Sequence, residues 1–477
     1  MSRLLIVSTR LPVTLTTDDS GTSVVPSVGG LATGLRGPHE RSGGVWIGWP
    51  GQAAPSDVGR REEIARLLAQ HRTAPVWLTQ SEVTRFYEGA ANGVVWPLFH
   101  YLIDQLPLRV EHWDAYESVN ARFADAVMAH YRPGDRIWVH DYQLMLLPAL
   151  LRARLPAAAR IGFFLHIPFP CDEVFATLPP REAVLRGLLG ADLVGFHTAA
   201  YARHFAASVE RVLHLPASPD AVEMDGRRAR IGVFPMGVDA ADIEARAQQP
   251  EVTAEAATLA PVAPADDAAP NGDVALFVGV DRLDYTKGIP RRLLAFETLL
   301  ERHPELHERV RLIQVAVPSR TGVRAYQKFR NQVDALVGRI NGAFGTPRWT
   351  PVHYLYRSIP DAQLLALYRA ARVMLVTPVR DGMNLVAKEF VACRADEDGV
   401  LVLSEFVGAA AELSDALCVN PYDVSATAHM YHRALVMSRD ERRARMRSLR
   451  ARVRSYDVHA WADSFLGSLD EAVSGGR

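Results

Sequence analysis

The chain lacks the features that mark secreted and membrane proteins. Its three cysteines, Cys171, Cys393 and Cys418, lie far apart and form no CxxC or CxxH pair. This spacing excludes a disulfide framework and a cysteine zinc site, and it suits a reducing cytosol. No run approaches the roughly 20 apolar residues of a membrane-spanning helix, and the apolar start is too short for a signal peptide. We therefore expect a soluble, cytoplasmic protein with no membrane partner.

There is also no excess of charge of one sign. The 477 residues include 53 Lys and Arg against 54 Asp and Glu, for a net charge of −1, and 48% are hydrophobic. A globular chain of this length has room for more than one core. Because no global basic field would attract nucleic acid, we expect no nucleic-acid partner.

Several motifs of nucleotide enzymes are missing. No strand is followed by GxGxxG, and neither GxxxxGK[ST] nor GxSxG occurs. A nicotinamide site, a P-loop kinase and an α/β-hydrolase are therefore unsupported. Asp396-Glu397-Asp398 matches the DxD pattern that holds a metal in one class of sugar transferases, but it lies in a polar stretch. We interpret it as a solvated loop.

What the chain does contain is a regular alternation of short apolar runs and helical segments. The runs are apolar throughout and do not alternate between apolar and polar residues, as expected for strands covered on both faces. The pattern predicts an α/β fold with doubly wound parallel sheets. The expected strands are Leu4–Ser8, Arg136–His140, Ile161–His166, Leu193–Thr198, Ile231–Pro235, Ala275–Val280, Val310–Val317, Val373–Pro378 and Val400–Ser404.

Two segments bear on domain organisation. Ala247–Asp273 is rich in Ala, Pro and acids, with almost no large apolar residues, which predicts a linker or surface excursion. After Asp457, a candidate N-cap, helical apolar spacing predicts an amphipathic helix. Spacing alone favours packing of this helix on the second half of the chain, with packing on the first half as the alternative. Its apolar positions are Val458, Trp461, Phe465, Leu466 and Leu469.

Three turns that follow strands carry glycine or cations: Val28–Gly34, Asp281–Gly288 and Arg380–Glu389. Free N–H groups and the dipole at a helix start attract negative charge. Arg282 can bind a phosphate through two N–H groups, and Lys287 offers a point charge. The alternative is a pair of solvated surface charges. Three such turns suggest a ligand with more than one phosphate.

The last of these turns also offers carboxylates. Asp381 could bind a sugar hydroxyl and Glu389 a ribose diol. The backbone N–H groups of Met383, Asn384 and Leu385 would face a diphosphate. The alternative is an N-cap aspartate and a surface glutamate.

The first half has polar groups at expected strand ends. His140, Asp141 and His166 lie where open α/β sheets bind ligands, although a single such histidine is more often structural. Arg10 and Arg320 are further strand-end cations that could bind a second anion. An aromatic cluster could stack on sugar faces or simply form core. Its members are Trp46, Trp49, Phe86, Tyr87, Trp96 and Tyr101.

Together these residues resemble the trehalose-6-phosphate synthases, retaining glycosyltransferases with two Rossmann-like domains facing across a cleft (GT-B). The resemblance covers nearly the whole chain. The motifs that carry it are Trp46–Trp49, Trp96–Tyr101, His140–Tyr142, Leu165–Pro170, Arg282–Gly288, Gly338–Gly342 and Arg380–Glu389. The resemblance implies an acceptor-binding domain over 1–240, a nucleotide-sugar domain over 241–455, and a helix over 456–477 that crosses back to the first domain.

The resemblance also implies roles for single residues. Catalytic roles fall to Asp141, His166, Arg282, Lys287 and Asp381. Donor binding falls to Gly29 and Gly30 of a mobile loop, His166, Arg282, Lys287, Ile359, Asp381, Gly382, Met383, Asn384, Leu385, Val386 and Glu389. Acceptor binding falls to Arg10, Tyr87, Trp96, Asp141 and Arg320, with both arginines on the acceptor phosphate.

The implied reaction is metal- and cofactor-independent transfer of glucose from a nucleoside diphosphate to glucose 6-phosphate. UDP-glucose is the expected donor, with GDP- and ADP-glucose as alternatives because base contacts in the family are largely backbone. No carboxylate pair at the separation of retaining hydrolases is evident, which favours front-face transfer with Asp141 orienting the acceptor. The other hypotheses are a cyclitol-using pseudo-glycosyltransferase, a non-catalytic regulatory relative and a sugar-phosphate sensor. A homo-oligomer is compatible with each.

Overall fold

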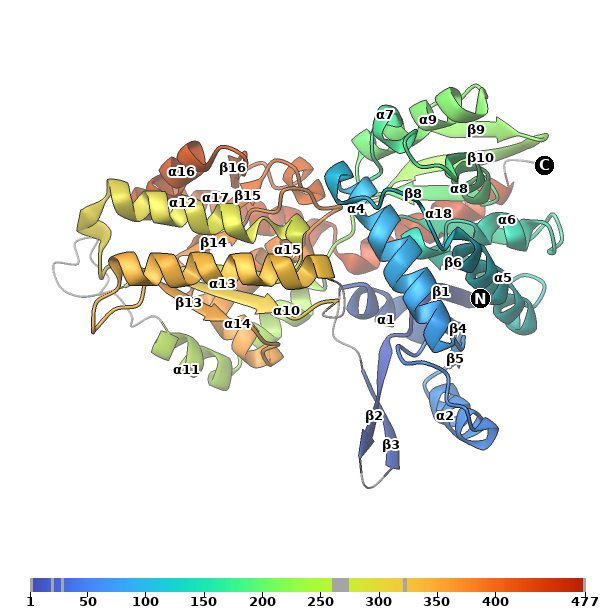
Figure 1. The fold of residues 1–477 in the computed structure, drawn as a ribbon, viewed down its shortest axis with the longest axis horizontal. Coiled ribbons are helices and arrows are strands. Elements are labelled where there is room, and N and C mark those ends of the chain that lie inside the picture. The colour runs from blue at the N-terminus through green and yellow to red at the C-terminus, as the bar shows by residue number, and fades with distance from the viewer. Residues whose placement is uncertain (1–2, 19–20, 27–29, 260–273, 321–323, 475–477) are drawn as a thin grey trace. The chain divides into compact units, whose positions relative to one another are not determined.

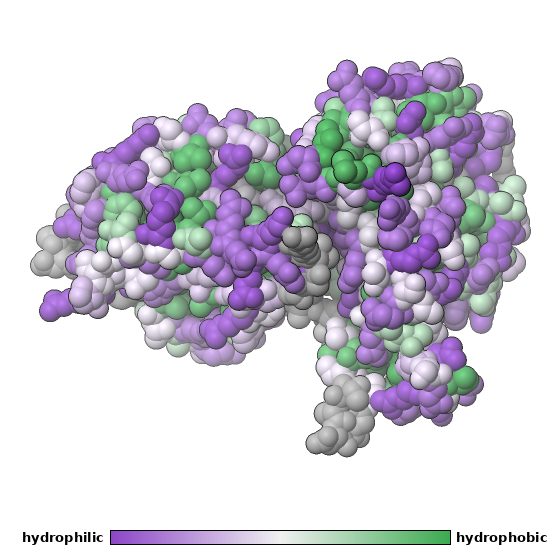
Figure 2. Space-filling view, viewed as in Figure 1, coloured by the Kyte–Doolittle hydropathy of each residue, from purple (hydrophilic) through white to green (hydrophobic). Residues whose placement is uncertain are grey.

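The computed structural model describes residues 3–18, 21–26, 30–259, 274–320 and 324–474. The chain divides into two compact units, the first made of Met1–Met236 and Val458–Arg477 and the second of Gly237–Asp457. The divisions therefore fall after 236 and 457, against the expected 240 and 455. Figure 1 shows the elements of each unit, and hydrophilic residues cover most of the face seen in Figure 2.

The first unit is built on an eight-stranded sheet in the order β5-β4-β1-β6-β7-β8-β10-β9. All neighbours pair in parallel except β9 and β10. Its strands are β1 (Leu4–Arg10), β4 (Val45–Trp49), β5 (Thr73–Pro75), β6 (Arg136–His140), β7 (Arg160–Phe164), β8 (Leu193–Phe196), β9 (Ala221–Met224) and β10 (Arg227–Val233). A separate hairpin is formed by β2 (Val13–Asp18) and β3 (Gly21–Pro26), and it projects from the unit in Figure 1.

The second unit has a six-stranded, fully parallel sheet in the order β13-β12-β11-β14-β15-β16. In chain order this is 3-2-1-4-5-6, the order of the Rossmann fold. Six adjacent strands of the first sheet, from β5 at its edge to β8, repeat this order, so the predicted α/β class with two Rossmann-like sheets is confirmed. The strands are β11 (Ala275–Arg282), β12 (Val310–Val317), β13 (Val352–Leu355), β14 (Val373–Val376), β15 (Val400–Ser404) and β16 (Leu417–Val419).

Helices cover both faces of each sheet, which is why the strands are apolar throughout. In β11, Phe277 belongs to one core cluster and Val278 to the other, so the strand feeds two cores. The helices of the first unit are α1 (Gly30–Ser42), α2 (Val58–Gln70), α3 (Gln80–Glu82), the π-helix η1 (Val83–Val95), α4 (Trp96–Phe99), η2 (Ile103–Gln105), α5 (Trp113–His130), η3 (Tyr142–Leu144), α6 (Leu147–Arg152), α7 (Asp172–Phe175), α8 (Arg181–Leu188), α9 (Ala199–Leu213) and α18 (Val458–Ser474). Those of the second are α10 (Ala240–Ala247), α11 (Pro250–Leu259), η4 (Tyr285–Lys287), α12 (Ile289–Arg302), η5 (Pro304–Leu306), α13 (Arg324–Phe344), α14 (Asp361–Ala370), α15 (Leu385–Cys393), η6 (Gly408–Ala411), α16 (Val424–Val436) and α17 (Arg439–Ser455).

The C-terminal helix α18 packs on the first sheet, not on the second unit that precedes it in the chain. The Phe465 ring stacks on Trp138 of β6 at 4.5 Å between centroids. Two glycines make room for it, because a Cβ at Gly162 or Gly195 would lie 2.7 Å from the Phe465 ring. Packing on the second half, which spacing alone favoured, is therefore wrong.

The segment expected to be a linker is partly regular. Its first part forms α11, whose Val252 and Ala256 are buried in a core cluster of the second unit. The prediction of a linker is wrong for Pro250–Leu259, because small apolar residues suffice to pack this helix. Residues 260–273 lie outside the described part of the chain.

Candidate active site

In the first unit, the chain reverses its winding between the adjacent strands β1 and β6, the position at which open α/β sheets bind ligands. Asp141 follows β6 directly with φ 75° and ψ 168°, a conformation that is almost restricted to glycine. Its Oδ1 accepts a hydrogen bond from the backbone N–H of His166, at 3.2 Å. Holding a non-glycine residue there costs about 1–3 kcal/mol. The surrounding fold therefore fixes this carboxylate in place.

Histidines from neighbouring strand ends meet in this region. His140 Nδ1 lies 3.0 Å from His166 Nε2, and the His166 ring lies edge-on to His197 at 5.6 Å between centroids. Burial holds the pKa of His140 and of His166 well below the usual 6.5. Both rings are therefore neutral at pH 7 and act through hydrogen bonds. His197 was not predicted, although it follows the end of β8 as His140 ends β6.

Arg10, at the end of β1, packs on an aromatic ring. Its guanidinium lies over the Trp49 ring at 5.0 Å, and Trp49 contacts Tyr87 edge-on at 5.3 Å. Gly51 has φ 97°, and a Cβ at this position would overlap with the guanidinium. The structure thus brings together Arg10 and Tyr87, which were both predicted for the acceptor.

The remaining aromatic residues of the predicted cluster are largely core. Trp46, Phe86 and Trp96 are at most 4% exposed. Trp96 packs on Tyr142, with 5.6 Å between ring centroids, and thereby contacts the turn that follows Asp141. Trp96 is therefore a wall of this region rather than an exposed sugar platform.

In the second unit, the corresponding reversal lies between β11 and β14. Lys287, at the end of η4, donates to Asp381 Oδ2 over 2.5 Å, and both side chains are largely buried. Asp381 also accepts from its neighbour Gly382 N–H at 2.9 Å and from Asn384 Nδ2 at 3.1 Å. The cation from one predicted turn and the carboxylate from the other are therefore partners.

Asp284 organises the cations of this turn. Burial alone would raise the pKa of this carboxyl, but the Arg320 guanidinium, followed by Arg282 and Lys287, lowers it to about 2. Arg320 Nη1 donates to Asp284 Oδ2 over 3.1 Å and also contacts the Tyr326 hydroxyl. One nitrogen of Arg320 is therefore engaged by Asp284 and Tyr326. The predicted contact of Arg320 with the acceptor phosphate stays a prediction.

A buried cation that sequence reasoning missed supports the same strand end. Arg292 of α12 is 1% exposed and donates to Asp281 and to Gln314 Oε1, the latter at 2.8 Å. Its Nε also donates to Thr377 Oγ1 at 3.0 Å, just after β14. Arg292 thus ties β11, β12 and β14 together beneath the turn. Its place inside an amphipathic helix gave no signal of this role.

The start of α15 has the expected helix-end geometry. Asn384, with φ 72°, is the N-cap, and its side chain accepts from Ala387 N–H. The N-cap is therefore Asn384 and not Asp381. As in any helix, the first N–H groups have no partner one turn earlier in the helix, and these include those of Leu385 and Val386. Met383 is buried just ahead of them.

Glu389 and Ile359 border this helix start. Glu389 Oε2 accepts from the Tyr368 hydroxyl at 3.1 Å, and burial raises the pKa of the Glu389 carboxyl. Ile359, between β13 and α14, packs on the core cluster that contains α15 residues. Gly30 begins α1, whereas Gly29 lies outside the described residues.

The acidic Asp396–Asp398 stretch is ion-paired. Asp398 bonds to the buried Arg442 at 2.6 Å, and Asp396 to Arg394 at 2.9 Å. The interpretation as a merely solvated loop was incomplete, since these carboxylates anchor α15 and α17.

The family model for glycosyltransferase family 20 matches residues 2–471. The chain belongs to glycosyltransferase family 20. It is thus a hexosyltransferase by class, as the motifs predicted.

Curated relatives support this assignment. The chain is 45% identical over 99% of its length to a bifunctional trehalose-6-phosphate synthase/phosphatase of Thermoproteus tenax, of which it spans 64%. It is 41% identical to a UDP-forming alpha,alpha-trehalose-phosphate synthase of Schizosaccharomyces pombe, over 98% of the chain and 90% of that protein.

Solved structures agree in fold. An E. coli structure described as bound with UDP-2-fluoro glucose has a TM-score of 0.85 and 36% identity, covering 98% of this chain and 99% of its own. A Burkholderia xenovorans alpha,alpha-trehalose-phosphate synthase in complex with glucose-6-phosphate has a TM-score of 0.85 and 35% identity, covering 98% and 100%. Within the described residues of the family 20 chain, no helix combines the length and apolarity needed for a membrane span.

Proposed function

We propose that this family 20 enzyme transfers glucose from UDP-glucose to glucose 6-phosphate, with retention, giving α,α-trehalose 6-phosphate. The observation that carries the proposal is the pairing of Lys287 with Asp381 at the strand-order reversal of the second sheet, beside the start of α15. The cation and the helix start can supply positive charge to a diphosphate. The carboxylate can accept a hydrogen bond from a sugar hydroxyl. Relatives named as UDP-forming synthases support the donor.

In the proposed reaction, the anomeric hydroxyl of glucose 6-phosphate forms a bond to C1 of the donor glucose. The bond from C1 to the diphosphate oxygen breaks, and that oxygen takes the hydroxyl proton. Negative charge grows on the leaving diphosphate, where we place Arg282, Lys287 and the first N–H groups of α15. A preorganised partner for such a charge is worth about 2.7–4 kcal/mol of the barrier. We propose that these groups suffice without a metal ion.

The acceptor assignment rests on the first unit. We assign the phosphate to Arg10, whose guanidinium lies over Trp49 in the space that Gly51 leaves, and Tyr87 lies in the same aromatic group. Asp141 is fixed by its backbone and by His166 N–H, which suits orientation of the acceptor. The neutral His166 would hydrogen-bond a hydroxyl of the donor glucose.

The deciding experiment compares UDP-, GDP- and ADP-glucose, each with glucose 6-phosphate, and follows nucleotide release and the disaccharide product. We expect release only when both substrates are present, fastest with UDP-glucose, undiminished by EDTA, and an α,α product by NMR. No release with any donor would identify a non-catalytic relative or sensor, and turnover of a cyclitol alone would identify the pseudo-glycosyltransferase. A glucosyl-enzyme adduct on Asp141→Asn, seen by intact mass, would overturn the orienting role of Asp141.

A further inference from the structure

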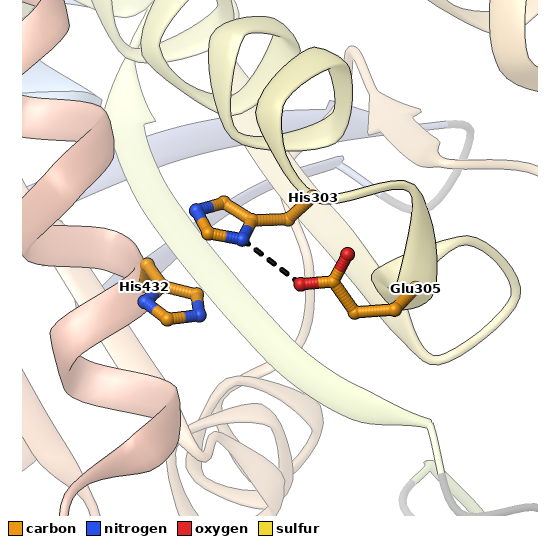
Figure 3. A group of neighbouring side chains, drawn as sticks. All are labelled: His303, Glu305 and His432. Carbon is orange, nitrogen blue, oxygen red and sulfur yellow. Dashed lines mark hydrogen bonds and ion pairs between the residues drawn. The ribbon is translucent and has the colours of Figure 1, made fainter.

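The second unit contains a group of metal-ligating side chains that the proposed transfer does not use. His303 follows α12, Glu305 lies in η5, and His432 lies on α16; the three side chains converge in Figure 3. His303 Nδ1 lies 2.9 Å from Glu305 Oε1. One ligand atom from each residue lies within 4.8 Å of the other two.

The chemistry of this group suits a divalent transition metal. Two imidazoles and one carboxylate are a known zinc ligand set that leaves a fourth position for water. With bonds of about 2.0–2.2 Å, tetrahedral ligand atoms lie roughly 3.3–3.6 Å apart. The His303–Glu305 pair is already near that spacing. The His303 and His432 rings now stack face to face at 3.8 Å, so a turn of the rings would aim both at one ion.

The elements that carry the ligands are fixed before any ion binds. Leu299 and Leu300 of α12 share a buried core cluster with Tyr431 of α16. Next to the ligands, Arg302 Nη2 donates to Ser425 Oγ at 2.7 Å and thereby joins the same two helices. The His303 side chain is 27% exposed, so an ion can reach it from solvent.

We infer that His303, Glu305 and His432 form a binding site for a divalent transition-metal ion such as Zn²⁺. The ion joins the end of α12 to α16. The site is distinct from the proposed transfer site, because the 14 residues of α12 separate His303 from Lys287, a span of about 20 Å.

The test is calorimetric titration of the full chain with Zn²⁺ alone, with no sugar or nucleotide. We expect a site whose affinity falls by about tenfold or more in His432→Ala and in Glu305→Gln, because loss of even an outer-shell partner costs about 10- to 100-fold in metal affinity. The exposed His71 supplies the matched control, His71→Ala, which should bind as the unmodified chain does. Zn²⁺ should also raise the melting temperature of the unmodified chain but not that of His432→Ala.

Glu305→Gln keeps the test decisive if a histidine variant fails to fold, because this side chain is 63% exposed. Equal Zn²⁺ affinity in the unmodified chain and in Glu305→Gln would overturn the inference. The same holds if the His71 control weakens binding equally, or if the unmodified chain binds no Zn²⁺.

Discussion

The two sheets share a strand order but carry different chemistry after their strands. In the first unit, the neutral His140 and His166 lie among aromatic rings. Between ring centroids, Trp138 lies 4.6 Å from His140 and Trp461 lies 6.1 Å from His166. In the second, Lys287 pairs with Asp381 and Arg320 with Asp284. Topology thus sets where ligands bind, whereas the residues that follow each strand set what is bound. Neutral donors and acceptors suit hydroxyls, and fixed charges suit phosphates.

The largest effect should come from removing Trp461, an aromatic ring that packs near the neutral His166 of the first unit. Trp461 is fully buried, 5.0 Å from Trp138 and 5.1 Å from Phe164 between ring centroids. We expect Trp461→Ala to lower the free energy of unfolding by about 3–5 kcal/mol, because it leaves a large cavity. Urea unfolding measures this. Asp463→Ala, at a position 73% exposed on the same helix, is the control and should change little. A loss no greater than that of the control would show that α18 does not support this site.

The next effect tests the paired charges of the second unit, Lys287 and Asp381. We expect Lys287→Ala to reduce kcat by about 100- to 1,000-fold, because the leaving diphosphate of the proposed transfer loses a preorganised cation. Steady-state kinetics with saturating glucose 6-phosphate gives the value. Lys328→Ala, on the exposed side of α13, is the matched control. An unchanged kcat with a raised donor KM would mean that Lys287 serves binding alone.

A third prediction separates the two sites by pH. Burial lowers the pKa of His140, so as pH falls below about 6.5 the unfolded chain takes up a proton that the native state refuses. Stability should then fall by about 1.4 kcal/mol per pH unit for this residue. His140→Gln should reduce the pH dependence of unfolding by about 1 kcal/mol between pH 6.5 and 5.5, because the unfolded histidine is only half protonated at pH 6.5.

The control for this prediction is His71→Gln, at an exposed position, which should leave the slope unchanged. An unaltered slope in His140→Gln would show that the ring charges without cost.

Asp284 should affect stability in a lower pH range, because its pKa is lowered to about 2. Its contribution is therefore complete above about pH 4 and is lost as pH falls toward 2.

The smallest effect concerns the cap of α15. Asn384 accepts from Ala387 N–H and adopts a left-handed conformation. Asn384→Ala should cost about 1 kcal/mol of stability, and Asn384→Gly should cost less because glycine tolerates this φ. Thermal unfolding of the two variants gives the order. Equal losses in the two variants would show that the left-handed backbone of Asn384 adds no strain, and no loss in either would show that the cap bond does not stabilise the chain.

Much of the fold could be predicted from continuous apolar runs. Arg136–His140, Val310–Val317 and Val400–Ser404 have the expected bounds. The hairpin strands β2 and β3, with six residues each, were missed. The other missed strands, β4, β5, β9, β13 and β16, have three to five residues each. A run this short has no reliable period of its own and becomes a strand because its neighbours complete its hydrogen bonds. Helix α11 was missed for a related reason, since its buried face needs only Val252 and Ala256.

The sequence by itself determined the repeated α/β pattern and the residue types after each strand, because both are local: an apolar run and the polar groups that end it. Only the tertiary structure decided which of these groups are partners. The pairing of Lys287 with Asp381 joins residues 94 positions apart, and the contact of Trp461 with His166 joins the last helix to the first half of the chain. Such contacts depend on how strands are ordered in the sheet, which no local pattern specifies.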